Sequence, residues 1–369
     1  MPRIHAARRQ RAAAAITALG ADAVLVTSAV NVRYLTGLVS SNAALLLPAD
    51  AEAVLGTDSR YAGTAERNCP DLELVIERDV DSALAGRVRD GGWQALAFED
   101  LWLSVRRYRR LGELAPARMV PAGDELDELR MVKDEEEIEL LARACAITGE
   151  AFSAMLGHLR PGVTELEYAI ALERAMIDLG AEAVAFDTIV ASGPNGAIPH
   201  HSPGDRAFEA GDMVTVDCGA RVDGYHADMT RTVAIGRPAA WQCEIYQLVA
   251  DAQAAGVAAA RPGADVQDVD AAARDVIEAA GHGGHFTHGL GHGVGLEIHE
   301  APLVGYARPG TLGDRVPITV EPGVYLPGKG GVRIEDTLVV RSGAGSAAAR
   351  DLLTTTETVT PGELLVLEP

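Results

Sequence analysis

The chain has few cysteines, a deficit of basic residues and no long apolar run, and each shortage excludes a class of protein. Its four cysteines are spread over 369 residues without any CxxC spacing, which argues against a disulfide framework and against a thiolate zinc site. Lys and Arg number 32 against 53 Asp and Glu, which gives a formal net charge of -21. Because such a surface repels phosphate backbones and anionic membranes, we expect no nucleic-acid partner.

The sequence also has little that would hold it in a membrane. No segment reaches the roughly 20 uninterrupted apolar residues that a membrane-spanning helix needs. The first residues, 1–15, are rich in Arg, but no apolar stretch of signal-peptide length follows them before Gly20. We therefore expect a cytoplasmic protein without a membrane partner, in which the cysteines are reduced.

What the chain does have is enough apolar material for two cores, because 48% of its 369 residues are hydrophobic. Short β-rich runs alternate with helical ones in residues 1–125 and predict an α/β domain with a mixed or largely parallel sheet. These runs are 23–26, 43–47, 72–76 and 95–98. A charged, helix-favouring stretch that begins at Lys133 opens a second domain, residues 126–369.

The second domain contains an internal repeat. An Arg-Pro-Gly tripeptide at 160–162 precedes an N-cap at Thr164 and an amphipathic helix that stops at Gly180. The same tripeptide at 261–263 precedes a cap and a second helix, which are Asp265 and the residues up to Gly281. Each half then runs through a segment with Gly and His into a β-hairpin with two acidic residues. We predict an α+β domain of two pseudo-twofold halves whose hairpins meet at a shared centre.

The acidic residues of the two hairpins are candidate metal ligands. Side chains alternate along a strand, so Asp217, Asp228, Glu321 and Glu335 converge from four strands, whereas Cys218 points away. Burying four carboxylates together is prohibitive unless cations neutralise them, and two divalent metals would do so. Taken one at a time, each residue would be explained as a solvated or hydrogen-bonded strand end, but their pairing on repeated hairpins favours metal binding.

An imidazole completes the predicted donor set. The Gly-rich segment 287–300 carries three histidines and two more follow Pro199, namely His288, His292, His299, His200 and His201. Alternating glycines allow the close backbone approach that a crowded metal centre needs. We choose His292 as the ligand and assign His282 and His285 to surface turns. Carboxylates with one imidazole suit Mn²⁺, Co²⁺, Fe²⁺ or Zn²⁺, and the sequence does not rank them.

Taken in order, these segments resemble the creatinase/prolidase/methionine aminopeptidase family, the metallopeptidases with the "pita-bread" fold. The matching segments of the second domain are 191–195, 199–200, 216–219, 227–232, 291–295, 321–325 and 332–337. Three segments of the first domain look like the creatinase-like N-terminal domain of the Xaa-Pro peptidases, namely 31–37, 57–61 and 129–133. The two-domain organisation distinguishes the chain from the shorter, single-domain methionine aminopeptidases.

The resemblance implies a role for each site residue. Asp217 would bind one metal, His292 and Glu321 the other, and Asp228 and Glu335 would bridge the two. All five ligand positions are filled, which counts against the creatinase branch, because that branch works without the metal cage. The remaining implied roles are a proton shuttle at Glu321, hydrogen-bond donors at His200 and His299, a pocket-lining role for His288, and substrate anchoring or orientation of Glu335 by Arg333.

The activity that the resemblance implies is hydrolysis of the bond between an N-terminal residue and proline. An Xaa-Pro dipeptidase (prolidase) that uses Mn²⁺ is the first expectation, and an Xaa-Pro aminopeptidase (aminopeptidase P) acting on longer peptides is the alternative. A peptide-binding or scaffold protein without turnover is a third, which the intact ligand set disfavours. Organophosphate hydrolysis is a conceivable side activity with no sequence feature of its own. Family similarity alone leads us to expect a homodimer.

Overall fold

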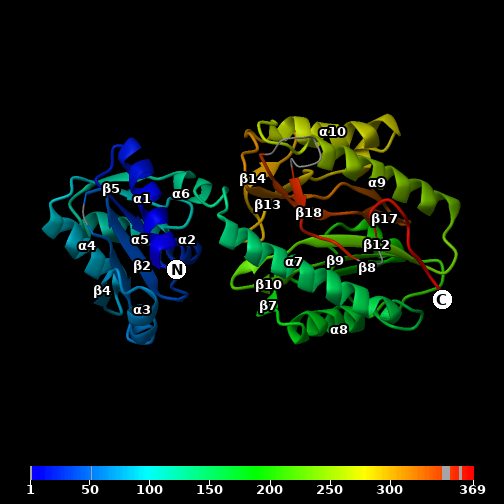
Figure 1. Ribbon diagram of the computed structural model, residues 1–369, viewed down its shortest axis with the longest axis horizontal. Helices are drawn as coiled ribbons and strands as arrows, with labels where there is room; N and C mark the ends of the chain where they lie inside the picture. Colours follow the sequence, from blue (N-terminus) through cyan, green and yellow to red (C-terminus); the bar gives the residue numbers. More distant parts are fainter. Residues whose placement is uncertain (1, 51, 343–349, 357–359) are drawn as a thin grey trace. The chain divides into compact units, whose positions relative to one another are not determined.

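A computed structural model of the chain describes residues 2–50, 52–342, 350–356 and 360–369. The chain divides into two compact units, Met1–Arg130 and Met131–Pro369 (Figure 1). This boundary lies five residues after the division that we predicted at residue 125. The division into domains of residues 1–125 and 126–369 stays a prediction.

The first unit is built on one mixed six-stranded sheet with the strand order β4-β3-β2-β1-β5-β6. Its strands are β1 (Ala23–Val26), β2 (Ala43–Pro48), β3 (Val54–Thr57), β4 (Glu73–Ile76), β5 (Ala95–Phe98) and β6 (Arg118–Pro121). Its helices are α1 (Pro2–Ala18), α2 (Ala29–Thr36), α3 (Ala62–Asn68), α4 (Val80–Gly91), α5 (Val105–Leu114) and α6 (Glu125–Glu128). Strand β1 runs antiparallel to β2 and parallel to β5, which confirms the predicted mixed α/β arrangement.

The second unit opens with a long helix, α7 (Glu135–Met155), whose start follows from its sequence. The Asp134 carboxylate accepts a hydrogen bond from the Glu137 amide at 3.0 Å, and the Glu137 side chain accepts one from the Asp134 amide at 2.9 Å. By length and composition alone this helix could cross a membrane, but 56% of its most apolar stretch is buried inside the unit. It is packed as the core helix of this unit.

The second unit contains two similar halves. In the first half α7 and α8 (Glu165–Asp178) pack on a sheet of β8 (Ile189–Ser192), β9 (Met213–Cys218), β12 (Met229–Ile235) and β20 (Val366–Leu367). In the second, α9 (Ala240–Ala259) and α10 (Val266–Ala279) pack on β13 (Gly291–Gly293), β14 (Glu300–Val304), β15 (Val316–Val320), β18 (Asp336–Val340) and β19 (Arg350–Leu352). Figure 1 shows the two helix pairs on opposite sides of the strands, so the predicted duplication is confirmed.

Short elements complete this unit. They are β7 (Ala183–Val184), β10 (Ala220–Val222), β11 (Tyr225–His226), β16 (Gly323–Leu326), β17 (Gly330–Arg333), η1 (Leu156–His158), η2 (Gly193–Ala197) and η3 (Gly283–His285). The predicted helix caps are present, because the Thr164 hydroxyl accepts from the Glu167 amide and the Asp265 carboxylate accepts from the Gln267 amide. The stop signals also hold, with Gly180 and Gly281 at positive φ of 104° and 82°.

Each predicted hairpin is interrupted between an outer and an inner pair of strands. Strand β9 pairs with β12 and β15 pairs with β18, whereas β10 pairs with β11 and β16 with β17 in separate sheets. At the first interruption Gly219 admits no side chain, because an added Cβ would lie 1.9 Å from the Ala227 carbonyl oxygen. Of the four acidic residues predicted to lie on strands, only Asp217 does; the other three lie at these interruptions, namely Asp228, Glu321 and Glu335. The breaks therefore place carboxylates where the strands turn away from their neighbours.

Candidate active site

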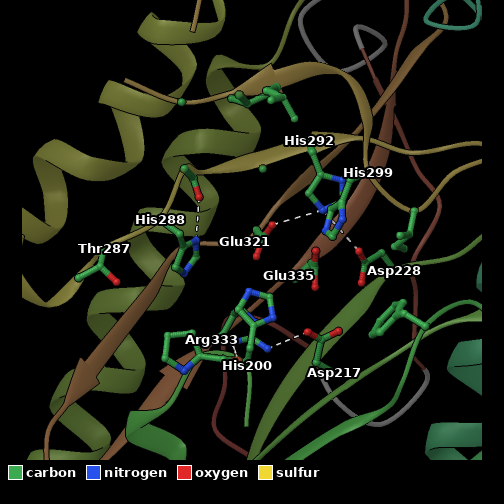
Figure 2. A pocket seen from close by; sticks show the side chains of 18 of the residues that line it. His200, Asp217, Asp228, Thr287, His288, His292, His299, Glu321, Arg333 and Glu335 are labelled. Atoms are coloured by element: carbon green, nitrogen blue, oxygen red, sulfur yellow. Dashed lines mark hydrogen bonds and ion pairs between the residues drawn. The ribbon is translucent and has the colours of Figure 1, made fainter. Parts of the chain in front are cut away.

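A cavity of about 780 Å³ lies in the second unit, between its two halves. Its lining includes every site residue predicted from the sequence: His200, Asp217, Asp228, His288, His292, His299, Glu321, Arg333 and Glu335. Figure 2 shows His292 and His299 on one side, Asp217 and Arg333 on the other, and Glu335 between them. Segments separated by more than 100 residues in the sequence thus contribute to one site.

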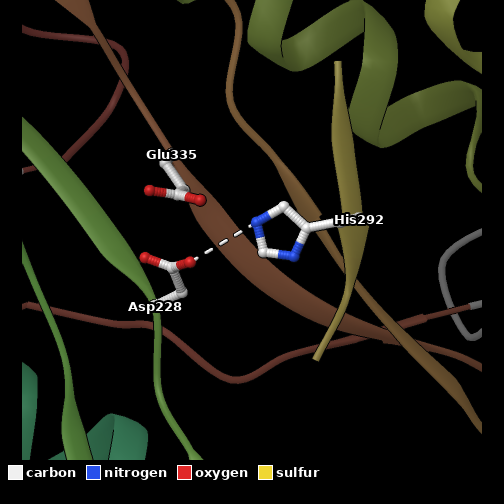
Figure 3. A group of neighbouring side chains, drawn as sticks. All are labelled: Asp228, His292 and Glu335. Carbon is white, nitrogen blue, oxygen red and sulfur yellow. Dashed lines mark ion pairs between the residues drawn. The ribbon is translucent and has the colours of Figure 1, made fainter. Parts of the chain in front are cut away.

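The tightest group in the cavity is Asp228, His292 and Glu335, whose ligand atoms all lie within 4.8 Å of one another (Figure 3). The His292 Nε2 atom is 3.6 Å from an Asp228 oxygen and 3.5 Å from a Glu321 oxygen. On the other side of the ring, Nδ1 lies 3.0 Å from the Gly293 carbonyl oxygen and donates to it. This hydrogen bond fixes the tautomer and leaves the Nε2 lone pair facing the carboxylates.

The electrostatics of the cluster fit divalent cations. Arg333 pairs with Asp217 at 2.7 Å. Burial lowers the pKa of His292 to about 4 and keeps its ring neutral. The other three carboxylates therefore have no cationic partner among the described residues. Burial, followed by the charge of a neighbouring glutamate, raises the pKa of Asp228 and of Glu335 well above the usual range. Burial also raises the pKa of Glu321 to about 8.

A buried carboxylate oxygen of Asp217 also favours bound cations. In the part of the chain that the structure describes, the Asp217 Oδ1 atom is buried without a hydrogen-bond partner, although Oδ2 accepts from Arg333. A buried acceptor without a partner costs about 1–3 kcal/mol, and more when it is charged. Four carboxylates and one neutral imidazole therefore form a donor set that two divalent ions would satisfy.

Neighbouring side chains orient these ligands. The Thr230 hydroxyl donates to Glu335 Oε2 at 2.7 Å, and Arg333 Nε lies 3.1 Å from the same hydroxyl. On the opposite face of β12, as strand alternation predicts, Arg231 pairs with Asp336 at 2.7 Å and donates to the Glu335 carbonyl oxygen at 2.6 Å. Both faces of the strand thus hold the Glu335 segment in place.

Arg333 is almost fully engaged within the protein. Only 3% of its surface is exposed, and its guanidinium donates to Asp217, to the Tyr325 hydroxyl at 3.0 Å and to the Pro199 carbonyl oxygen at 3.2 Å. Of the two roles that the sequence left open, this geometry favours orientation of a ligand over anchoring of a substrate. The ligand that it contacts is Asp217, on the facing strand, where we had expected Glu335.

The predicted histidines occupy different surroundings. His288 Nδ1 donates to the Gly289 carbonyl oxygen and Nε2 accepts from the Tyr325 hydroxyl, both at 2.8 Å, while burial lowers the His288 pKa to about 4. The His299 ring meets that of His292 edge-on, with centroids 4.4 Å apart, and burial lowers its pKa as well. His200 is exposed at the cavity wall. The neutral rings of His288 and His299 can donate or accept hydrogen bonds without adding charge.

Other histidines are outside the cavity lining. His201 lies 2.8 Å from a Glu165 carboxylate oxygen. His282 and His285 contact each other in and beside η3, with their Nδ1 atoms 3.3 Å apart, consistent with the surface turns to which we assigned them.

Several lining residues were not identified from the sequence. They include Phe186, Ile298, Leu303, Tyr306 and Arg308. Their positions depend on how the segments before β8 and around β14 fold back over the cavity, and no local spacing signals that path. Tyr325 was quoted in a matching segment, and its contacts with both His288 and Arg333 emerge only when β16 is paired with β17.

Comparisons with known proteins give a consistent result. The family model for metallopeptidase family M24 matches residues 139–342, and that for the Creatinase/Prolidase N-terminal domain matches residues 8–132. An uncharacterized peptidase of Bacillus subtilis is 38% identical over 351 residues, which cover 95% of this chain and 97% of that protein.

Two solved structures are also similar. The Xaa-Pro dipeptidase from Bacillus anthracis has a TM-score of 0.93 and 36% identity, covering 98% of this chain and 100% of that one. The X-Pro aminopeptidase from Thermotoga maritima has a TM-score of 0.86 and 35% identity, covering 96% of this chain and 100% of that one. The identities of 36% and 35% do not separate a dipeptidase from an aminopeptidase.

Proposed function

The chain belongs to metallopeptidase family M24, with the pita-bread fold in its second unit, and within this family we propose that it is an Xaa-Pro dipeptidase. The observation that carries the proposal is the cluster of four carboxylates, three of them buried and Glu321 partly buried, with a neutral imidazole in a cavity of about 780 Å³. Such a cluster is costly without cations and has little use outside metal-assisted chemistry. We further propose that the protein acts in the cytoplasm as a homodimer.

The proposed ligands divide between two metal ions, with Mn²⁺ as the first choice. Asp217 would hold one ion and His292 and Glu321 the other, and Asp228 and Glu335 would be shared between them. When bound, two divalent ions lower the pKa of water toward neutrality and polarise the carbonyl of the bond to be cleaved. Glu321 accepts a proton from the attacking water on a carboxylate oxygen and passes it to the leaving nitrogen.

The histidines in the cavity are proposed to bind the substrate. His299 and His200 donate hydrogen bonds to the substrate carboxylate or to the developing oxyanion. His288, held by Tyr325, lines the substrate pocket beside the metal ligands. Apolar side chains that also line the cavity, including Phe186 and Leu303, offer a surface against which a proline ring can pack.

The decisive experiment uses two substrates. Protein stripped of metal by a chelator is assayed on an Xaa-Pro dipeptide and on an Xaa-Pro-Yaa tripeptide, before and after Mn²⁺ is added. Restored cleavage of the dipeptide alone supports the dipeptidase, whereas preference for the tripeptide would make the protein an aminopeptidase. Cleavage of other peptides but of no Xaa-Pro peptide would end the proline assignment, and absence of tight divalent-ion binding would favour a non-catalytic role.

Replacing His299 with alanine should separate substrate contact from metal binding. We expect turnover to fall by about 100-fold, because a hydrogen bond to developing charge is lost, while the metal content stays at the wild-type level. Metal content by elemental analysis and steady-state kinetics on the same preparation test this. His282→Ala, which removes an imidazole outside the cavity, is the matched control, and loss of metal from the His299 variant would contradict the assignment.

A further inference from the structure

The segment that carries His200 is closed around one buried carboxylate. Glu165, the first residue of α8, has no exposed surface. Its Oε1 atom accepts hydrogen bonds from the Ser192 amide at 2.8 Å, the Ser192 hydroxyl at 2.6 Å and the Asn195 side chain at 3.0 Å. Its Oε2 atom contacts His201 Nε2 at 2.8 Å and the Gly204 amide at 3.3 Å. A single side chain therefore joins both ends of segment 192–204.

This carboxylate is not needed to cap the helix on which it lies. The first turn of α8 already has a capping box, in which Thr164 and Glu167 satisfy each other's amides. Burial alone would raise the pKa of Glu165, but the hydrogen bonds from Ser192, Asn195 and His201 outweigh burial and lower it. The side chain is thus an anion stabilised by the segment that it organises, and not by its own helix.

His200 lies between two fixed points. The carbonyl oxygen of the preceding residue, Pro199, accepts a hydrogen bond from Arg333 at 3.2 Å, and the following residue, His201, contacts Glu165 at 2.8 Å. His200 lines the cavity, whereas His201 is absent from the lining and has 16% of its side chain exposed. Adjacent histidines therefore face different surroundings, and the second fixes the backbone from which the first projects.

We propose that Glu165 and His201 are positioning residues that hold His200 at the cavity wall, with His201 making no contact with the substrate. The proposal rests on the proposed function, because it gives His200 a role in substrate binding. An error of about 1 Å in the placement of a substrate-binding group can cost about 100-fold in rate. The hydrogen bonds at Pro199 and His201, one on each side of the exposed His200, limit such errors.

The second half of the unit has a comparable arrangement at a different place. Asp270, the fifth residue of α10, accepts from the Leu290 amide at 3.0 Å and pairs with Arg274 at 2.7 Å. Arg274 in turn donates to the His288 carbonyl oxygen at 2.8 Å. Because Glu165 is the first residue of its helix and Asp270 the fifth, the two anchors are not equivalent positions of the repeat. Each half has its own carboxylate to hold a histidine-bearing segment.

Two substitutions of His201 test the proposal. His201→Ala removes the contact with Glu165 and should lower kcat/KM for the cleaved peptide by about 10- to 100-fold. His201→Gln keeps an N–H donor of similar reach and should stay within about threefold of wild type, by the same reasoning. Metal content should be unchanged in both, and hydrogen exchange in residues 193–204 should accelerate only in His201→Ala. Equal losses in the two variants, or no loss in either, would overturn the proposal.

Glu165→Gln is a second route to the same contact. It keeps the volume of the side chain, but its one carbonyl oxygen cannot accept at both former carboxylate positions, so either the donors at Ser192 and Asn195 or those at His201 and Gly204 lose their acceptor. It should therefore reduce kcat/KM as His201→Ala does. The matched control is Glu173→Gln on the same helix, outside the cavity lining and this network, which should behave as wild type. If Glu165→Gln does not fold, the His201 pair still decides the question.

A double-mutant cycle with His200→Ala distinguishes this proposal from the proposed function. If His201 acts through His200, His201→Ala should cause little further loss in a protein that already lacks the His200 ring. Losses that multiply, with His200→Ala itself impaired, would overturn the positioning role and leave the substrate-binding role of His200 intact. A fully active His200→Ala would instead refute the role of His200 and the positioning proposal with it.

Discussion

Asp228→Ala and Glu335→Ala should each reduce hydrolysis by about 1,000-fold or more, because the loss of about 4 kcal/mol of transition-state stabilisation corresponds to that factor. Both carboxylates are buried, with 5% and 1% exposure, and with His292 they form the tightest donor group in the cavity. Because each is proposed to contact both metal ions, either substitution should also lower the number of ions bound. Elemental analysis and kinetics on metal-saturated protein measure the two losses.

Asp187→Ala is the matched control for these variants. Asp187 is an acidic residue of the same cavity lining, but it is exposed, so its removal should leave metal content unchanged. A variant of Asp228 or Glu335 that retained two bound ions and normal turnover would refute the bridging role. Loss of activity with full metal content would assign the residue to catalysis without a ligand role.

The sequence predicted those features that depend on residues near one another in the chain. The predicted caps at Thr164 and Asp265 involve partners three and two residues away, and such contacts follow from spacing alone. Strand alternation likewise separated Asp217 from Cys218, because the two faces of a strand are fixed by parity. Strand parity was therefore sufficient to predict the side of Asp217, but not of Asp228, Glu321 and Glu335, which lie in breaks between strands.

Some local elements were nevertheless missed. Helix α9 has a signal in the sequence, since Gln242 caps the Ala239 amide at 2.6 Å and the helix is rich in alanine. Strand β3 has only four residues, and one of them, Gly56, weakens a strand pattern. Its glycine is explained by packing, because an added Cβ would lie 2.6 Å from Val80, and such a contact with α4 has no local signature.

The sequence did not predict the contacts between distant segments. The pairing of Arg333 with Asp217 joins residues 116 apart, and the contact of His201 with Glu165 joins residues 36 apart. Both depend on the register of strands and on the path of a loop, which periodicity does not determine. This is why the sequence identified which residues form the site but left Arg333 between anchoring a substrate and orienting Glu335, and gave His201 no role.

Metal removal should make the stability of the protein fall as pH rises. In the metal-free fold, burial raises the pKa of Glu321 from 4.5 to about 8, and raises those of Asp228 and Glu335 well above their usual range. In the unfolded chain these groups ionise near their ordinary values of about 4. Between about pH 4 and pH 8 the folded state therefore binds more protons than the unfolded state, so the free energy of unfolding decreases with increasing pH.

Bound metal should reverse this trend. Cations neutralise the ionised carboxylates, and their binding becomes tighter as pH rises because protons no longer compete for the same oxygens. Thermal denaturation from about pH 5 to pH 8, with and without Mn²⁺, should give melting temperatures that diverge with pH, by about 5 °C or more at the upper end. Metal-free Glu321→Gln, which cannot ionise at this position, should show a shallower decline than metal-free wild type. Parallel pH profiles for the metal-free and metal-loaded proteins would mean that these carboxylates do not require cations to remain buried.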